Sequence, residues 1–364
     1  MNFDVNNRTI LLVKHGSHAY GLNNEKSDLD LRGICIEPLD FTISCVNNFE
    51  QSIAKDEQLN IDSTVFGLKK FMKLALDSNP NVVEILFVTE EEIVKVTELG
   101  QKLIDNRDLF LSQKVYHTFG GYAKAQLKRL ENHRRWITNP PDEPPSREQY
   151  GLLEKSAISK QQLEAAFSML SKKIDTWNCK DLTGEDFSSR VEILNAMSEI
   201  IAEIIENSQT TIDKVAANSI GFDSNFIEYI NREKSYQAKK EEYSNYINWK
   251  NTRNKKRYET EEKCLCDTKH ASHLIRLLYQ SIDVLNGNGL KLKLDKERRQ
   301  ILLDIKNGKF EKNTYEFVIN LKDKLLIDLE RAYQNSLIPK RPDYHRVDNL
   351  MREIYFENFF LNKK

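Results

Sequence analysis

Hydrophobic and polar positions divide this chain into a front part with strand character and a longer part with helical character. Three short runs near the N-terminus are typical of strands: residues 9–13 (TILLV), 29–36 (LDLRGICI) and 57–66 (EQLNIDSTVF). Residues 67–79 then have apolar positions at helical spacing, and Pro80 ends the predicted helix.

From about residue 98 onward the apolar positions follow the 3.6-residue period of helices. The segments with this spacing are 111–137, 153–177, 190–219, 225–247, 268–285 and 313–336. Four prolines interrupt the pattern at about residues 138–151, which predicts an exposed loop or hinge. We therefore expect an α+β protein, with a domain of mixed sheet and helices at residues 1–108 and a larger all-α domain at residues 109–364.

The composition is that of a soluble globular protein, with 364 residues, 40% of them hydrophobic and 30% charged. No apolar run reaches the roughly 18 residues of a membrane-spanning helix, and the N-terminal sequence lacks the apolar core of a signal peptide. Five cysteines are too few for a disulfide framework in a chain of this length. We expect a cytoplasmic protein without a membrane partner.

The net charge of −1 conceals an uneven distribution. The first 100 residues contain nine Lys and Arg against 16 Asp and Glu, so the remaining residues carry a net charge of +6. An acidic front part suits metal binding, and a mildly basic remainder suits a partner that carries phosphate.

The stretch 13–33 (VKHGSHAYGLNNEKSDLDLRG) concentrates side chains that suit phosphate and metal chemistry. Gly16 and Ser17 follow the first apolar strand, where a turn would present backbone N–H groups and a hydroxyl to phosphates. Asp28 and Asp30 are two residues apart, so a strand would place both carboxylates on one face. Such a pair favours Mg²⁺ between its members, although a polar turn beside an exposed strand edge would show the same residues.

The joint pattern resembles the nucleotidyltransferase fold of the DNA polymerase β superfamily. More narrowly, it resembles a family of nucleotidyltransferases from bacteria and phages, some of whose members sit beside RNA ligases. The stretches that carry the resemblance are GSHAYGL at 16–22, SDLDLRG at 27–33, the segment 62–87 with Asp62 at its start, and the segments 267–285 and 304–308.

This resemblance implies a nucleoside triphosphate (NTP) as substrate and two Mg²⁺ or Mn²⁺ ions as cofactors. Asp28, Asp30 and Asp62 would be the catalytic carboxylates and the metal ligands, with Asp62 also a candidate base. The turn at Gly16 and Ser17 would position the β- and γ-phosphates.

Further nucleotide contacts are expected from cationic side chains. Arg32 either contacts phosphate or braces the carboxylates, and both interpretations stay open. In the segment 269–278, Lys269, His273 and Arg276 fall on one helix face, with His270 adjacent. A solvated polar face has the same spacing, but the family resemblance of this segment leads us to expect nucleotide contact.

Two basic segments with interleaved aromatic residues are candidates for nucleic-acid binding. The residues concerned are Lys124, Lys128, Arg134, Arg135, Arg253 and Arg257. Such segments can hold a phosphate backbone and stack bases, although ordinary charged helices have a similar composition.

Four soft metal ligands lie within ten residues, namely Cys264, Cys266, His270 and His273. Ligands so close together rarely surround one ion, and the two histidines point to different helix faces, so we expect no zinc site from this set. The family usually has a Gly-Tyr pair where this chain has Leu265 and Cys266. The tyrosine is therefore missing here, and any base stacking that it provides in the family is in doubt for this chain.

We therefore expect an enzyme that moves a nucleoside monophosphate from an NTP to an acceptor hydroxyl and releases pyrophosphate. The favoured acceptor is an RNA end, as in RNA repair, with an RNA ligase as a candidate partner in the pathway. Nucleotidylation of a protein or small molecule would use the same chemistry. A non-catalytic nucleotide- or RNA-binding regulator would use the same fold, but the intact aspartates argue against it.

Overall fold

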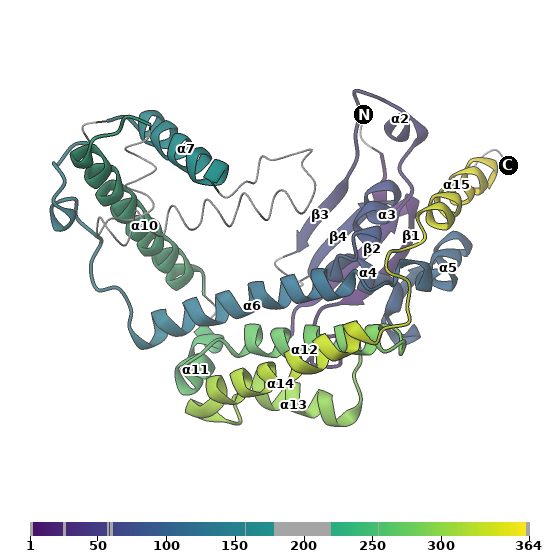
Figure 1. Cartoon of the computed structure of the whole chain (residues 1–364). Coiled ribbons are helices and arrows are strands. Elements are labelled where there is room, and N and C mark those ends of the chain that lie inside the picture. The colour runs from purple at the N-terminus through teal and green to yellow at the C-terminus, as the bar shows by residue number, and fades with distance from the viewer. Residues whose placement is uncertain are drawn as a thin grey trace. The chain divides into compact units, whose positions relative to one another are not determined.

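The computed structural model describes residues 3–24, 27–56, 58, 61–156, 158–177, 220–253 and 255–361. The chain forms two compact units. The first unit consists of residues 1–139 and 254–364, and the second of residues 140–253. Figure 1 shows the sheet and most of the long helices in the first unit.

The sheet of the first unit is mixed. Its strands are β1 (Thr9–His15), β2 (Leu29–Cys35), β3 (Gln51–Asp56), β4 (Ile61–Gly67) and β5 (Ile93–Val96). They lie in the order β3-β4-β2-β1-β5, in which β2 and β4 are parallel and the other neighbours are antiparallel. The three predicted strands correspond to β1, β2 and β4. The prediction missed β3 and β5, whose residues are mostly exposed and so lack a buried apolar face.

Helices make up most of the rest of the first unit. The α-helices are α1 (Val5–Arg8), α2 (Leu39–Thr42), α3 (Leu68–Leu76), α4 (Pro80–Val83), α5 (Glu98–Asp105), α6 (Val115–Thr138), α11 (Lys255–Cys264), α12 (Thr268–Leu285), α13 (Lys296–Lys306), α14 (Thr314–Gln334) and α15 (Tyr344–Leu361). Short 3₁₀ segments are η1 (Glu84–Phe87), η2 (Glu90–Glu92), η3 (Arg107–Phe110) and η5 (Glu311–Asn313). The predicted helices in this unit correspond to α3, α6, α12 and α14. The expected plan, a sheet-containing front part followed by a larger helical part, is confirmed.

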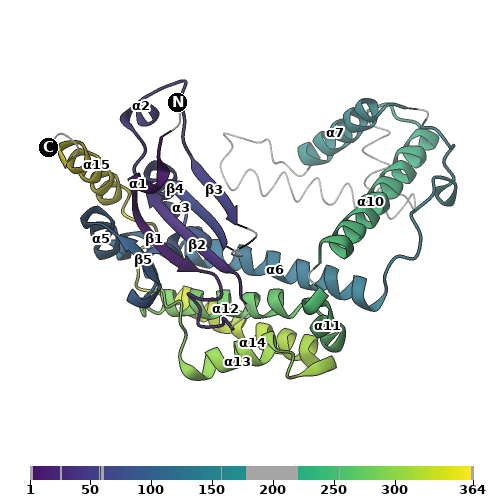
Figure 2. The same cartoon turned by 180° about the vertical axis from the view of Figure 1, so that it is seen from behind.

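Helix α12 is the central helix of this unit. The Asp267 carboxylate caps its N-terminus by accepting hydrogen bonds from the backbone N–H groups of Lys269 and His270. Most of α12 is buried, because it lies between α6 and α14, as both views show (Figures 1 and 2). One apolar core continues from the sheet, at Leu11, to this helix, at Leu277.

The last helix returns to the sheet-containing part of the chain. On α15, the Tyr355 hydroxyl donates to Glu37 Oε1 at 2.8 Å, and Glu37 Oε2 accepts from the backbone N–H of Leu68 at 2.9 Å. Lys102 pairs with Glu353 on the same helix. The first compact unit therefore contains both ends of the chain. Its limits differ from the domain division expected after residue 108, which stays a prediction.

The second unit contains η4 (Glu148–Tyr150), α7 (Lys160–Trp177) and α10 (Ser224–Thr252). Two predicted helices correspond to α7 and α10, and the one expected at 190–219 lies outside the described residues. The Arg147 guanidinium donates to both Glu233 carboxylate oxygens, at 2.7 and 2.8 Å, and so fastens the end of the proline-rich segment to α10.

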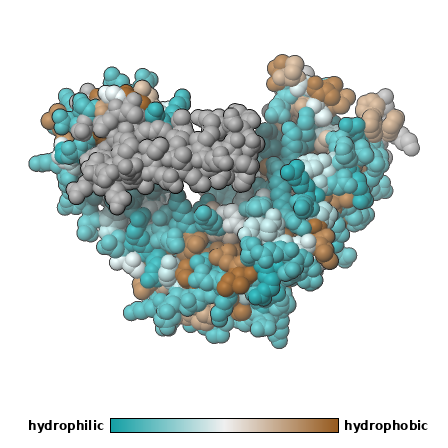
Figure 3. Space-filling view, viewed as in Figure 1, coloured by the Kyte–Doolittle hydropathy of each residue, from teal (hydrophilic) through white to brown (hydrophobic). Residues whose placement is uncertain are grey.

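Where residues are described, the face in Figure 3 is predominantly hydrophilic. Apolar side chains are exposed around α2, at Leu39 and Ile43, and on α15, at Phe356 and Phe360. None of the described helices combines the length and the apolar character that crossing a membrane requires.

Candidate functional site

A tight turn follows β1 and brings backbone close to a carboxylate. Gly16 has a φ of +61°, and a Cβ at this position would come into close contact with Asp30 Oδ2. The turn is closed by backbone hydrogen bonds from Tyr20 N to the Gly16 carbonyl and from Leu22 N to the Ser17 carbonyl. The positive φ therefore favours glycine at position 16, and a larger residue there would have to displace the Asp30 carboxylate.

The sheet register brings two of the predicted aspartates side by side. Asp30 on β2 is opposite Asp62 on the parallel strand β4, and opposite His15 at the end of β1. Residues paired in neighbouring strands have their side chains on the same face. Asp28 lies two residues before Asp30, directly ahead of β2, and it is exposed. Acidic side chains thus gather where the β1 turn begins.

This set of donors fits a hard divalent cation. Carboxylate oxygens are the ligands that Mg²⁺ prefers, and the exposure of Asp28 and Asp62 leaves room for water and substrate oxygens. The oxygens of the three aspartates do not all lie within 4.8 Å of one another. Among the residues that the structure describes, that proximity occurs for His133, Asp267 and His270. Metal binding by the aspartates stays a prediction.

Arg32 lies next to the carboxylates on β2. Its guanidinium donates to the Thr64 hydroxyl at 3.2 Å and to the Leu31 carbonyl at 3.1 Å. Thr64 is the register partner of Arg32 on β4. These contacts support the bracing interpretation of Arg32, because the side chain links the two strands that carry the aspartates.

A buried ion pair contacts Tyr20, which belongs to the turn after β1. Glu84 and Arg276 are both almost inaccessible to solvent, and the Arg276 guanidinium donates to Glu84 Oε1 at 2.6 Å. Glu84 Oε2 accepts a hydrogen bond from the Tyr20 hydroxyl at 2.6 Å and lies 3.4 Å from His15 Nε2. Arg276 also stacks over the Tyr20 ring, with its Cζ 3.6 Å from the ring centre.

The charges of this network are set by burial and by pairing. Burial alone would raise the pKa of Glu84, but the Arg276 charge, the neighbouring His15 and the hydrogen bond from Tyr20 outweigh it and lower the pKa to about 2. Burial raises the pKa of Tyr20 well above its ordinary value, as does the neighbouring Glu84 carboxylate. Glu84 is therefore ionised and Tyr20 neutral at pH 7, and the pair holds the turn from behind.

Sequence reasoning did not single out Glu84. The available signal was a lone acidic residue inside the apolar run NVVEILFV at residues 81–88. A charge in such a run is buried when the run packs into a core, and it then needs a partner. The chain also holds that partner, Arg276, inside an equally apolar helix.

The cationic residues of α12 do not form one solvated face. Lys269 is exposed, His270 and His273 are partly buried, and Arg276 is buried. Burial lowers the pKa of His273 to about 3. The Arg276 guanidinium is enclosed by Glu84 and Tyr20, which favours a positioning role over the expected nucleotide contact. Contact by Lys269, His270 and His273 stays a prediction.

The candidate nucleic-acid residues differ in their surroundings. On α6, the side chains of Lys124, Lys128 and Arg135 are exposed, whereas Arg134 stacks over Tyr315 at 4.0 Å. Arg253 belongs to the second compact unit, where it stacks over Trp249 at 4.1 Å. The side chain of Arg257 lies outside the described residues.

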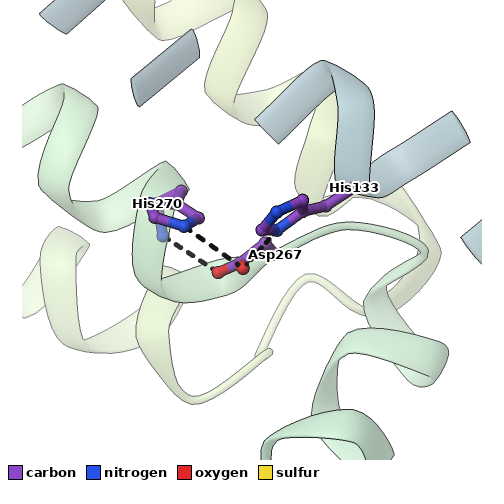
Figure 4. Close-up of side chains that lie close together, drawn as sticks. All are labelled: His133, Asp267 and His270. Atoms are coloured by element: carbon purple, nitrogen blue, oxygen red, sulfur yellow. Dashed lines mark hydrogen bonds and ion pairs between the residues drawn. The ribbon is translucent and has the colours of Figure 1, made fainter. Parts of the chain in front are cut away.

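The two cysteines and the histidines considered above as a possible zinc set have different surroundings in the structure. Cys264 and Cys266 are buried free thiols, and burial raises the pKa of Cys266 to about 12. His270 instead lies beside Asp267 and beside His133 from α6 (Figure 4). The prediction missed His133, since it lies 134 residues before Asp267.

A family model matches the part of the chain that contains the sheet. A model of the RNA repair pathway DNA polymerase beta family matches residues 2–139. An uncharacterized 38.9 kDa protein from the nrdC-mobD intergenic region of Enterobacteria phage T4 is 29% identical over 130 residues, which are 34% of this chain and 38% of that protein. The resemblance expected in segments 267–285 and 304–308 lies beyond the family match and stays a prediction.

A nucleotidyltransferase-like protein from Exiguobacterium sibiricum, known from a crystal structure, aligns with 66% of this chain and 72% of its own. Its TM-score of 0.20 and identity of 11% are too low to support any conclusion. The family match contains the β1 turn, Asp28, Asp30, Asp62 and Glu84. Residues 2–139 of the chain are thus similar to the RNA repair pathway DNA polymerase beta family, a family of polymerase-β-like nucleotidyltransferases.

Proposed function

We propose that this chain transfers a nucleoside monophosphate from an NTP to a hydroxyl group at an RNA end. The observation that carries the proposal is the pairing of Asp30 with Asp62 beside the Gly16 turn. That arrangement offers oxygen ligands for divalent cations next to backbone groups that suit phosphate. The RNA repair family of residues 2–139 supports RNA as the acceptor.

The aspartates would hold two Mg²⁺ or Mn²⁺ ions, with Asp28 and Asp30 shared and Asp62 bound to one. When bound, these ions supply charge neutralisation at the phosphates and lower the pKa of the attacking hydroxyl. Asp62 is exposed and can also orient that hydroxyl or accept its proton. The new bond joins the acceptor oxygen to the α-phosphorus, and the bond to the departing pyrophosphate breaks.

The turn after β1 would hold the β- and γ-phosphates through Ser17 and its backbone N–H groups. Tyr20 positions this turn because it is fastened to Glu84, which Arg276 in turn holds. Lys269 is exposed on α12, so it can supply a positive charge to the nucleotide or the acceptor. On α6, the exposed Lys124, Lys128 and Arg135 are the candidates for the RNA backbone.

The test is label transfer from each of the four α-³²P NTPs into RNA, with Mg²⁺ or Mn²⁺ present. We expect labelled RNA from the wild type and from Asp40→Ala, an exposed aspartate on α2 that serves as the matched control. The variant Asp28→Ala/Asp30→Ala should give none. Label in protein or in a small molecule would overturn the RNA acceptor. Nucleotide binding without transfer to any acceptor would favour a regulator.

A further inference from the structure

Three potential metal ligands from distant parts of the first unit meet beside the N-terminus of α12. His133 comes from α6, Asp267 is the capping residue of α12, and His270 lies in its first turn (Figure 4). His133 Nδ1 is 2.8 Å from Asp267 Oδ2, and His270 Nε2 is 3.6 Å from the same oxygen. The ligand atoms of all three residues lie within 4.8 Å of one another.

The hydrogen bonds around the cluster already orient its ligand atoms. His270 Nδ1 lies 2.7 Å from Gln126 Oε1, and because an amide oxygen only accepts, the ring nitrogen donates. In a neutral ring, Nε2 then presents its lone pair toward the Asp267 carboxylate. Two electron-rich atoms facing each other are unfavourable unless a cation lies between them. The other oxygen of Asp267 is held by the backbone N–H groups of Lys269 and His270.

We propose that His133 Nδ1, Asp267 Oδ2 and His270 Nε2 bind one divalent transition-metal ion, with Zn²⁺ the favoured occupant. In a tetrahedral zinc site with bonds of about 2.0 Å, neighbouring ligand atoms are about 3.3 Å apart. The two distances to Asp267 Oδ2 fall on either side of this value. His133 would move its proton from Nδ1 to Nε2, a change of tautomer that needs no movement of the ring.

The surroundings suit an ion with an open fourth position. The side chains of His133 and His270 are 15% and 21% exposed, whereas that of Asp267 is 4% exposed. An ion there reaches solvent on one side and has its ligands fixed on the other. Gln126 and the α12 backbone would be the outer partners that orient the ligands, as is usual for metal-binding histidine and carboxylate.

Nitrogen donors distinguish this site from the proposed Mg²⁺ site. Imidazole suits zinc and other transition metals, whereas the aspartates of the sheet offer only oxygen. A bound ion would join the second half of α6 to the start of α12, the helix whose Arg276 braces the β1 turn. The proposal does not depend on the proposed function, because the ion would bind whether or not the protein transfers nucleotides.

The test is titration of the metal-stripped full chain with Zn²⁺, and with Co²⁺, whose visible spectrum distinguishes tetrahedral nitrogen-containing sites from octahedral oxygen sites. We expect the wild type to bind one equivalent with a tetrahedral Co²⁺ spectrum and to melt at a higher temperature with Zn²⁺. His133→Ala and His270→Ala should lose both effects. His345→Ala, which removes an exposed histidine on α15, should keep them, as should Asp28→Ala/Asp30→Ala.

His270→Gln guards against a loss that comes from misfolding, because glutamine can still donate to Gln126 but is a poor zinc ligand. It should fold, as judged by circular dichroism, and lack the tetrahedral spectrum. A wild type that shows no such spectrum would overturn the proposal. An unchanged spectrum in folded His133→Ala and His270→Gln would do the same, since the ion would then have other ligands.

Discussion

Asp30 of β2 lies opposite Asp62 of β4, in the parallel pairing next to the strand that ends at the Gly16 turn. Two carboxylates on neighbouring strands repel each other and lower the stability of the sheet unless a cation lies between them. The protein therefore retains an arrangement that is unfavourable for folding alone. That cost is expected where residues serve binding or catalysis rather than stability.

The first prediction concerns Asp62→Asn. Without metal, this substitution removes one of two like charges, so the free energy of unfolding should stay the same or rise by up to about 1 kcal/mol. Nucleotide transfer should fall by more than about 100-fold, because even the outer partners of metal ligands contribute 10- to 100-fold. Urea unfolding with EDTA and the labelling assay measure the two effects.

The melting temperature of the same variant with Mg²⁺ distinguishes a metal ligand from an ordinary surface aspartate. Mg²⁺ should raise the melting temperature of the wild type and of Asp40→Ala, and should raise that of Asp62→Asn less. Equal stabilisation of all three by Mg²⁺, together with full activity of Asp62→Asn, would remove Asp62 from the site.

The second prediction is that Gly16→Ala is damaging whereas Gly121→Ala is not. A Cβ at position 16 would collide with Asp30 Oδ2, and the positive φ adds about 1–2 kcal/mol for a residue with a side chain. Gly121 lies in α6 with no atom near its added Cβ, and alanine there should raise stability by up to about 1 kcal/mol. Thermal unfolding and the labelling assay test both variants. Wild-type activity in Gly16→Ala would show that the turn need not approach Asp30.

Part of the site followed from the sequence because its determinants are local. The two-residue spacing of Asp28 and Asp30 and the glycine after β1 depend on strand alternation and turn chemistry. The position of Asp62 beside Asp30 is not local, and we expected it only from the family resemblance. The parallel register of β2 and β4 places these two residues side by side.

The sequence does not reveal contacts that depend on which elements pack against each other. Helical spacing assigned Arg276 to a cationic face, but it could not show that Glu84, 192 residues earlier, would meet it in the core. Helical spacing also could not predict that His133 on α6 would lie beside Asp267, 134 residues later. The hydrogen bond from Tyr355 on α15 to Glu37 was likewise not foreseeable, because it joins residues 318 positions apart; the domain division after residue 108 stays a prediction.

The third prediction is that Glu84→Gln lowers stability by about 3–5 kcal/mol at pH 7, because it leaves the buried Arg276 charge without its partner. Arg276→Met in the same background should restore part of the loss. Denaturant unfolding of the single and double variants measures both. Glu228→Gln is the matched control, since it removes an exposed partner of Arg232 and should cost about 0.5 kcal/mol or less.

The Glu84–Arg276 pair also predicts how the stability of the protein depends on pH. The pKa of Glu84 falls from 4.5 to about 2 on folding, so its contribution is complete above pH 4.5 and is lost as the pH falls toward 2. That contribution corresponds to about 3 kcal/mol. The stability difference between wild type and Glu84→Gln should therefore shrink between pH 4.5 and 2. A difference that stays constant over this interval would show that Glu84 is not held ionised by Arg276.

The fourth prediction concerns the exposed lysines of α6. If Lys124 and Lys128 each contact a phosphate of single-stranded RNA, Lys124→Ala/Lys128→Ala should weaken binding and lower the slope of log affinity against log salt by about 1.4. The control Lys296→Ala/Lys312→Ala removes two exposed lysines from α13 and η5 and should leave the slope unchanged. Fluorescence anisotropy at several salt concentrations gives both slopes. Equal slopes in the two double variants would mean that RNA, where it binds, does not use this face of α6.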